Sequence, residues 1–365
     1  MKRNTKIAAG LAIQAHLPAA LEGEPGVGKT AFFNSCGVQF GLKVYSIFGS
    51  CRSPEDIGGY PLPNKEGTAI SLVPAGIWQK ELMDLGKGLL VIDELTTCSG
   101  SMQAALMALI HEGRSGDIHF PKEVVRVAIY NPADQAAGGF DLAAPLANRL
   151  IHIPWSADAE TVIEGFQNGW SEAALPKLPS NWEEFKRPAA SLIASFLRKF
   201  PQLVQDFPKE ESKRSEAWPS PRSWWEFAIP SLAAVEATKL NDDILSILLC
   251  GSVGMGATET FLNWRRELDL PDPEELLGDW KKFEIADRHD KVFATLSAVV
   301  CAAVDKLTPD RWIAAWSILN KVALAGHVAL AASACRTLAK SRTSKMPNVT
   351  ELIKPFKPLL EAAGL

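Results

Sequence analysis

A glycine-rich loop with one lysine lies close to the N-terminus. Residues 23–30 match the pattern G-x-x-x-x-G-K-[ST], with a strand-like apolar run before them and a helical pattern after them. Glycines let such a loop turn its backbone N–H groups toward a phosphate chain, Lys29 can neutralise phosphate oxygens, and Thr30 can ligate Mg²⁺. The competing interpretation is a chance match, for which average residue frequencies give about one case in a hundred such chains. The residues expected to surround a nucleotide are Gly23, Glu24, Pro25, Gly26, Val27, Gly28, Lys29, Thr30 and Ala31.

Two acidic residues end an apolar run later in the chain. The segment GLLVIDE, residues 88–94, indicates a buried strand that ends in Asp93 and Glu94. If this strand lies beside the glycine-rich loop, Asp93 can hold Mg²⁺ together with Thr30. Glu94 is then placed to polarise a water molecule, which favours hydrolysis over transfer of phosphate to a small hydroxyl. For an isolated Asp-Glu pair, the alternative is the start of a solvated loop.

The elements that must position these residues alternate in type up to about Trp155. Short apolar runs separated by helical patterns are typical of βαβ units and predict a parallel sheet. Glycine-containing turns within residues 58–76 and 112–129 predict two β-hairpins inserted into this region. The predicted strands are Ala19–Glu22, Lys43–Phe48, Leu89–Asp93, Val124–Tyr130 and Leu150–Pro154.

Helical periodicity replaces the strand signals after Trp155, with prolines marking the breaks. We therefore predict an α/β fold with a five-stranded parallel P-loop NTPase core and inserted hairpins, followed by helices only. The predicted parts are a nucleotide-binding core (1–155), a helical lid (156–240) and a helical C-terminal extension of unassigned role (241–365). Long single helices are predicted at Asp243–Leu268 and Asp310–Lys340.

The order of these motifs resembles that of the AAA+ ATPases, and within them the MoxR-like branch, over about residues 5–240. The segments that carry the resemblance are EGEPGVGKT, RSPEDIGGY, LVPAGIW, LLVIDELTTCSGSMQAALMALIHEGR, GDIHFPKEVVRV, AIYNPAD, LANRLIHI and SPRSW. The resemblance implies an AAA+ core that binds ATP and Mg²⁺ and hydrolyses ATP in a ring, typically a homo-hexamer. It also implies a partner protein with a von Willebrand factor A domain, in a complex that the ring would remodel or activate.

Three further site residues follow from this resemblance. Asn131 is similar to sensor 1, which contacts the γ-phosphate or the attacking water, whereas a simple turn is the alternative for an Asn-Pro pair. Arg149 is similar to the arginine finger, which reaches the nucleotide of the neighbouring subunit; an exposed arginine at a helix end is the alternative. Arg222 looks like the sensor 2 arginine of the lid, and its competitor is stacking on Trp218 or Trp224.

The sequence departs from the MoxR-like pattern at two positions. The usual Asn-Arg pair after Asp-Glu is replaced by Leu-Thr-Thr-Cys at 95–98, which puts the usual contacts to a neighbouring subunit in doubt. Tyr130 stands where the family usually has glutamine before the sensor asparagine, a difference that bears on how the hydrolytic state is relayed.

Composition and charge indicate which other partners, metal sites and locations are compatible with the sequence. A net charge of −4 and a pI near 5.9 provide no general field for a polyanion, so a nucleic-acid partner is not favoured. The six cysteines show no metal-ligand spacing, and neither a signal peptide nor a membrane span is indicated, so we expect a cytoplasmic protein. Two alternatives stay open. One is a nucleic-acid-associated motor of the helicase or restriction type, with Lys65 or Lys122 on phosphates, and the other is a nucleotide-gated binding module with little turnover.

Overall fold

The computed structural model describes residues 3–74, 76–136, 138–168 and 174–364. The chain forms two units: unit 1 comprises Met1–Trp182 and Leu203–Glu259, and unit 2 comprises Glu183–Gln202 and Thr260–Leu365. The predicted boundaries at 155 and 240 do not coincide with these units, and they remain a prediction about the roles of the segments. Within the described ranges, no helix combines the length and the apolar character needed to cross a membrane.

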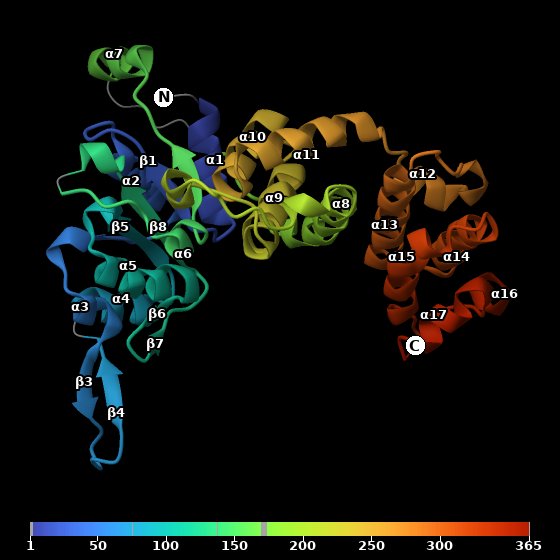
Figure 1. Cartoon of the computed structure of the whole chain (residues 1–365), viewed down its shortest axis with the longest axis horizontal. Helices are drawn as coiled ribbons and strands as arrows, with labels where there is room; N and C mark the ends of the chain where they lie inside the picture. The colour runs from blue at the N-terminus through green and yellow to red at the C-terminus, as the bar shows by residue number, and fades with distance from the viewer. Residues whose placement is uncertain (1–2, 75, 137, 169–173, 365) are drawn as a thin grey trace. The chain divides into compact units, whose positions relative to one another are not determined.

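Unit 1 is built around a five-stranded parallel sheet with the order β2-β5-β8-β1-β9. Strands β1, β5 and β8 of this sheet are labelled in Figure 1. In β5 four successive side chains, residues 89–92, are completely buried, as expected for a parallel strand that is covered on both faces. The predicted fold class is confirmed, and the ends of each strand differ from the prediction by at most one residue. The strands are β1 (Ala19–Glu22), β2 (Val44–Phe48), β5 (Gly88–Asp93), β8 (Val124–Tyr130) and β9 (Ile151–Pro154).

Helices pack on the sheet through apolar side chains. One core cluster joins Leu90 and Ile92 of β5 to Leu82 of α4 and Leu106 of α5. Elsewhere in unit 1, α1 contacts α10, and both helices contact β9. The α-helices of this unit are α1 (Arg3–Gln14), α2 (Lys29–Phe40), α3 (Pro54–Gly58), α4 (Ile77–Leu85), α5 (Gly100–Met107), α6 (Ala144–Ala147), α7 (Ala159–Asn168), α9 (Ile229–Thr238) and α10 (Asp242–Val253).

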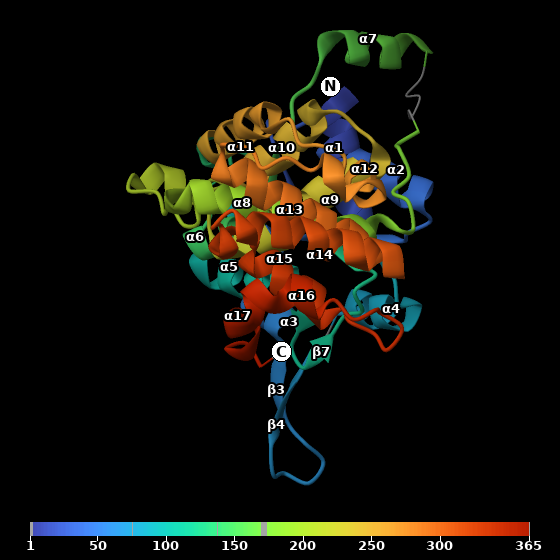
Figure 2. The same ribbon diagram turned by 90° about the vertical axis from the view of Figure 1, so that its right-hand side faces the viewer.

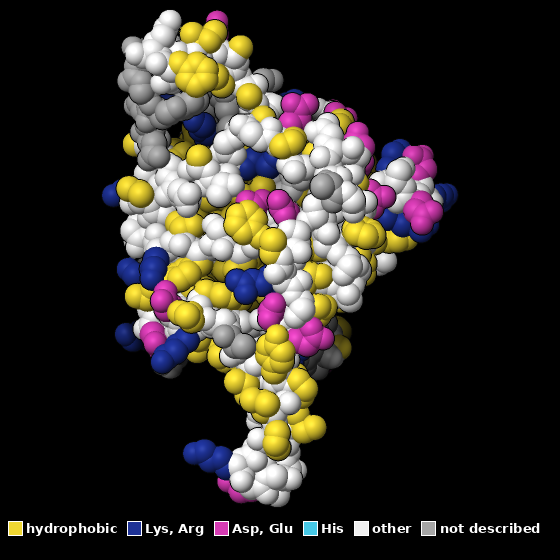
Figure 3. Space-filling view, turned by 90° about the vertical axis from the view of Figure 1, so that its left-hand side faces the viewer, with side chains coloured by type: hydrophobic (Ala, Val, Ile, Leu, Met, Phe, Trp, Pro, Cys, Tyr) yellow, Lys and Arg dark blue, Asp and Glu magenta, His cyan; other side chains and the backbone are white. Residues whose placement is uncertain are grey.

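Two β-hairpins are inserted into unit 1, as predicted. Strand β3 (Tyr60–Pro63) pairs with β4 (Ile70–Val73), and β6 (Arg114–Ser115) pairs with β7 (Ile118–His119), both antiparallel. The backbone N–H of Leu72 donates to Asp117 Oδ2 at 2.8 Å, and the N–H of Asp117 donates to Leu72 O at 2.9 Å, so the hairpins are joined. Hydrophobic side chains gather along the β3–β4 hairpin in Figure 3; the exposed ones are Tyr60, Leu62, Ile70, Leu72 and Val73.

Both long predicted helices are interrupted by a glycine with a left-handed backbone. Gly254, with φ 80°, separates α10 from α11 (Met255–Leu268), and the boundary between the two units falls within α11. Gly326, with φ 87°, separates α14 (Pro309–Leu324) from α15 (Val328–Lys340). The prediction of single helices was wrong because the hydrophobic periodicity continues across each break, whereas the backbone does not.

Unit 2 consists of helices joined by loops, with no strand among its described residues. Helices α13, α14 and α15 lie side by side (Figure 2), around Trp312 and Trp316, whose side chains are completely buried. The remaining α-helices of this unit, besides the C-terminal part of α11, are short or flank these three. The bounds not yet given are α8 (Lys186–Lys199), α12 (Pro273–Gly278), α13 (His289–Asp305), α16 (Thr350–Ile353) and α17 (Lys357–Glu361).

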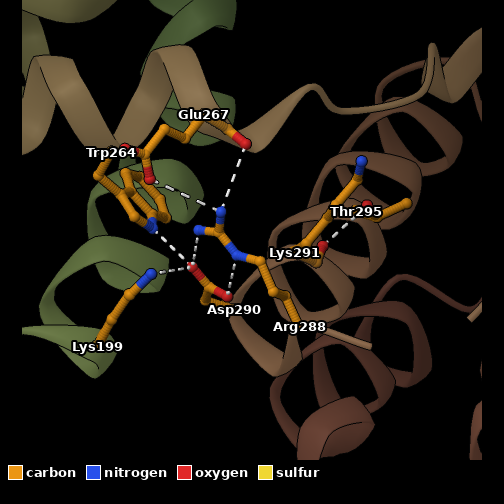
Figure 4. Close-up of polar contacts among 7 residues, drawn as sticks. All are labelled: Lys199, Trp264, Glu267, Arg288, Asp290, Lys291 and Thr295. Carbon is orange, nitrogen blue, oxygen red and sulfur yellow. Dashed lines mark hydrogen bonds and ion pairs between the residues drawn. The ribbon is translucent and has the colours of Figure 1, made fainter. Parts of the chain in front are cut away.

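A single carboxylate joins three segments of unit 2. Asp290, in the first turn of α13, accepts hydrogen bonds from Lys199 of α8, from the indole of Trp264 of α11 and from Arg288 (Figure 4). Chiefly because of the hydrogen bonds from Arg288, the pKa of Asp290 lies well below its ordinary value. This cluster therefore fixes α8 and α11 against the start of α13.

Candidate nucleotide site

The glycine-rich loop connects β1 to α2, and its shape depends on its glycines. Gly28 is the N-cap of α2 and has a left-handed backbone with φ 83°, a conformation that residues with a Cβ rarely adopt. At Gly23 the constraint is space, because a Cβ would lie 1.9 Å from the carbonyl oxygen of Trp155. The loop therefore folds tightly onto the N-terminus of α2, where backbone N–H groups and the helix dipole favour an anion.

Lys29 is the buried charge of the loop. Only 6% of the residue is exposed, and its ammonium donates hydrogen bonds to Gly23 O at 2.5 Å, Glu24 O at 2.8 Å and Asn131 Oδ1 at 2.7 Å. Burial lowers the pKa of Lys29, and the neighbouring carboxylate of Asp93 opposes this effect. The ammonium is thus held against the loop and against the end of β8. The other predicted loop residues are open to solvent: Glu24, Pro25, Gly26, Gly28 and Ala31 are exposed, and Val27 is partly exposed.

Thr30 and Asp93 come together beside Lys29. The hydroxyl of Thr30 donates to Asp93 Oδ2 at 3.2 Å. Burial raises the pKa of Asp93, and hydrogen bonds from the Glu94 N–H and from Thr30 oppose this rise. Among the described residues no group of three or more His, Cys, Asp and Glu side chains could hold a metal ion alone. A hydroxyl and one carboxylate are a partial ligand set suited to Mg²⁺, which usually completes its shell with phosphate oxygens and water.

Glu94 has a backbone that is unusual for its residue type. Its φ of 59° places it in the left-handed region, which costs a non-glycine residue of order 1–3 kcal/mol and is found mainly at functional sites. The surrounding structure fixes this conformation: the Glu94 N–H donates to Asp93 Oδ1 at 2.8 Å, and the Thr97 hydroxyl donates to Glu94 O at 2.7 Å. The hydroxyl of Ser50 donates to Glu94 Oε2, which orients the carboxylate.

Asn131 lies where β8 ends, next to the loop. Its side chain contacts Lys29, and its backbone carbonyl accepts a hydrogen bond from the Thr96 hydroxyl at 2.8 Å. Since Oδ1 is occupied by Lys29, the amide N–H groups remain the donors that a phosphate or a water could use. The loop, the Asp-Glu pair and Asn131 therefore meet at the carboxyl edge of three adjacent parallel strands, β5, β8 and β1.

The two predicted arginines form a separate group. Burial lowers the pKa of Arg149, and the positive charge of Arg222 lowers it further, so the two guanidinium groups interact electrostatically. The Arg149 side chain also interacts electrostatically with Glu226, Glu112 and His111. We call these five residues the arginine cluster.

Neither arginine reaches the loop of its own chain in the described residues. Arg149 donates to Pro145 O at 2.7 Å, and its buried Nε has no hydrogen-bond partner. Of the two rings named as competitors for Arg222, Trp224 donates its indole N–H to Leu203 O and Trp218 packs edge-on against Phe207. Neither contact excludes stacking on these rings, so stacking of Arg222 stays the alternative prediction. Arg149 and Arg222 thus interact electrostatically with each other, and no hydrogen bond or ion pair among the described residues joins either of them to Lys29, Asp93 or Asn131.

Sequence reasoning missed Ser50 and Thr96, which hold Glu94 and Asn131 in place. A signal for Ser50 was present, because it follows β2, and β2 is the neighbour of β5 in the sheet. Polar residues just beyond parallel strands gather at the same edge, where ligands of open α/β sheets bind. Thr96 lies in a short 3₁₀ turn, Leu95–Thr97, that the sequence did not indicate.

The comparisons with known proteins include a distant likeness to a solved structure. No protein-family model matches this sequence, and no curated protein matches it either. A solved structure described as a "putative ATPase" from Cytophaga hutchinsonii aligns with 70% of this chain and 87% of its own, at 14% identity and a TM-score of 0.42. The strand order and the loop geometry of this chain itself therefore carry the argument for a P-loop ATPase fold.

Proposed function

We propose that this chain binds ATP with Mg²⁺ and hydrolyses it. The observation that carries the proposal is the meeting of Lys29 with Asn131 and of Thr30 with Asp93 at one edge of the sheet. These contacts join segments far apart in sequence, and each pairs the residue types that phosphate, a metal ion and an attacking water require.

The arrangement assigns a role to each side chain. Lys29 would bind the β- and γ-phosphate oxygens, and Thr30 and Asp93 would hold Mg²⁺, which neutralises charge on the phosphates when bound. Glu94, oriented by Ser50, would accept a proton from the attacking water, and the Asn131 amide would donate a hydrogen bond to that water or to the γ-phosphate. The chain thus supplies binding, orientation and a general base, but its own loop lacks an additional positive charge for the transition state.

We further propose that this charge comes from a neighbouring copy in a ring of the MoxR-like AAA+ type, a homo-hexamer. Arg149 and Arg222 support this, because both lie in the arginine cluster and neither contacts the loop of its own chain. Because the two arginines interact with each other, both would contact the same nucleotide. The ring would use hydrolysis to remodel or activate a partner protein carrying a von Willebrand factor A domain, and unit 2 would contribute to ring contacts or to partner docking.

Two other functions receive less support. For a nucleic-acid motor, the β3–β4 hairpin presents one exposed lysine, Lys65, whereas five of its exposed residues between Tyr60 and Val73 are large and apolar. For a binding module without turnover, there would be no need to hold Glu94 in a strained conformation beside the metal ligands.

The Glu94→Gln variant tests hydrolysis directly. Loss of the general base should lower ATP turnover by about 10²- to 10⁴-fold, while ATP binding is retained because Gln keeps the side-chain shape. The matched control is Glu259→Gln, since Glu259 is exposed on α11. Phosphate release and the binding of a fluorescent ATP analogue would be measured on both variants. A Glu94→Gln protein that turns over ATP as fast as the control would refute the assignment.

A further inference from the structure

A second polar group lies inside unit 1, behind the loop. The hydroxyl oxygen of Tyr130 lies 3.3 Å from Glu22 Oε2 and 2.6 Å from Nδ1 of His152, and His152 Nε2 lies 2.9 Å from Ala147 O. Tyr130 and His152 are 4% and 7% exposed, so their polar atoms depend on protein partners. We call the three side chains and the Ala147 carbonyl the Tyr130 network.

One end of the Tyr130 network lies at the nucleotide site. Glu22 directly precedes Gly23, and Tyr130 directly precedes Asn131. The backbone supports this connection, because the Gly23 N–H donates to Tyr130 O at 3.2 Å. Gly23 O and Asn131 Oδ1 are both acceptors for Lys29, so a shift of Glu22 or Tyr130 would displace groups that hold the ammonium.

The other end lies at the arginine cluster. Ala147, whose carbonyl is bound by His152, is the last residue of α6, and Arg149 follows after one intervening residue. That residue, Asn148, accepts a hydrogen bond from the Ser220 hydroxyl at 2.8 Å and donates one to Trp218 O at 3.2 Å. The same short segment is therefore fixed both to the Tyr130 network and to the segment that leads to Arg222.

The protons in the Tyr130 network can be placed from its geometry. A carbonyl oxygen can only accept, so His152 Nε2 must carry a proton and donate it to Ala147 O. Burial lowers the pKa of His152, which favours a neutral ring whose Nδ1 accepts from the Tyr130 hydroxyl. Burial raises the pKa of Glu22, as does the negative charge of Glu216, whereas the hydrogen bond from the Tyr130 hydroxyl lowers it. The Tyr130 hydroxyl thus lies between two acceptors, Glu22 Oε2 at 3.3 Å and His152 Nδ1 at 2.6 Å, and the contact with His152 is the shorter one.

We propose that the Tyr130 hydroxyl is a positioning link that couples the nucleotide loop to Arg149. Polar contacts connect Glu22 through Tyr130 and His152 to the end of α6, so a displacement of the loop is transmitted to the segment that carries Arg149. The proposal rests on the proposed function, because it concerns how the ring site is assembled. If Arg149 serves the neighbouring nucleotide, this link transmits the state of one site to the next.

The Tyr130→Phe variant removes the hydroxyl and keeps the ring that fills the core. We expect kcat for ATP hydrolysis to fall about tenfold and KM to stay within about twofold, since a small misplacement of a catalytic group affects the transition state more than binding. In the assembled protein, Tyr130→Phe should cause no further loss of kcat when Arg149 is already replaced by alanine. A merely structural role would lower kcat by the same factor in both backgrounds, and that result would overturn the proposal.

The remaining outcomes separate this inference from the proposed function. If Arg149→Ala lowers kcat but Tyr130→Phe does not, the link is refuted and the ring site stands. If Arg149→Ala has no effect on kcat, both fail. A second pair of variants tests the contact between Glu22 and Tyr130: Glu22→Gln keeps a polar partner for the Tyr130 hydroxyl and should retain more of kcat than Glu22→Leu. Equal kcat for these two variants, with equal melting temperatures, would exclude Glu22 from the link.

Discussion

The nucleotide loop and the arginine cluster are two polar regions of unit 1 that differ in how their charges are satisfied. At the loop, the Lys29 ammonium has three acceptors, and each acid nearby has a donor from the same chain. In the arginine cluster, two positive groups interact electrostatically, and the buried Nε of Arg149 has no hydrogen-bond partner.

This difference supports the proposal that the site is divided between subunits. A buried donor without a partner is costly, and a ligand or a neighbouring subunit can satisfy it. The loop region contains a full set of groups for binding phosphate and activating water, whereas the arginine cluster contains positive charge with no phosphate site of its own. We therefore regard the first as a subunit's own half of the site and the second as the half offered to another subunit.

The largest expected effect comes from the loop side. Lys29→Ala should abolish detectable ATP turnover and weaken ATP binding by at least about a hundredfold, because it removes the charge that meets the phosphates. Lys80→Ala, at an exposed position on α4, is the matched control. Equilibrium binding of ATP with and without Mg²⁺ would be measured. Tight binding by the Lys29→Ala protein would show that the nucleotide site lies elsewhere.

The next effect comes from the arginine cluster and should leave ATP binding intact. We expect Arg149→Ala to lower kcat about a thousandfold, as for arginine fingers. Arg222→Ala should lower kcat less than Arg149→Ala does. In the Arg222→Ala variant the Arg149 guanidinium stays in place, because it is anchored to Pro145 O. Steady-state kinetics would be compared with Arg342→Ala, an exposed position in unit 2. A large rise in KM without a change in kcat would instead place these arginines in substrate binding.

The sequence predicted the sheet and the loop better than the links between them. Each strand of unit 1 is a short apolar run, so its position is visible locally, and the P-loop pattern fixed Lys29 and Thr30. Ser50 and His152 were missed because their roles depend on which strands become neighbours, β2 beside β5 and β9 beside β1. The electrostatic interaction of Arg149 with Arg222 depends on tertiary packing between distant segments, which periodicity does not report.

The smallest expected effect on turnover comes from a residue outside both regions. Asp290→Asn should leave kcat unchanged but destabilise unit 2 by about 2 kcal/mol, since Arg288 and Lys199 lose their carboxylate partner. The pKa of Asp290 is below its ordinary value, so its contribution is present above pH of about 4 and is lost as the pH falls through the lower, folded pKa. Urea unfolding at pH 7 and pH 3, with Asp287→Asn as the control, would measure it. The prediction is contradicted if the difference in free energy of unfolding between Asp290→Asn and Asp287→Asn is the same at pH 7 and at pH 3.

The most direct test of the divided site is to mix two inactive variants. Lys29→Ala subunits have an intact arginine cluster, and Arg149→Ala subunits have an intact loop. If subunits mix at random and Arg149 acts across the interface, an equal mixture should recover about a quarter of the parent turnover per site. Turnover in the mixture that does not exceed the sum of the two variants measured alone would contradict a site shared between subunits.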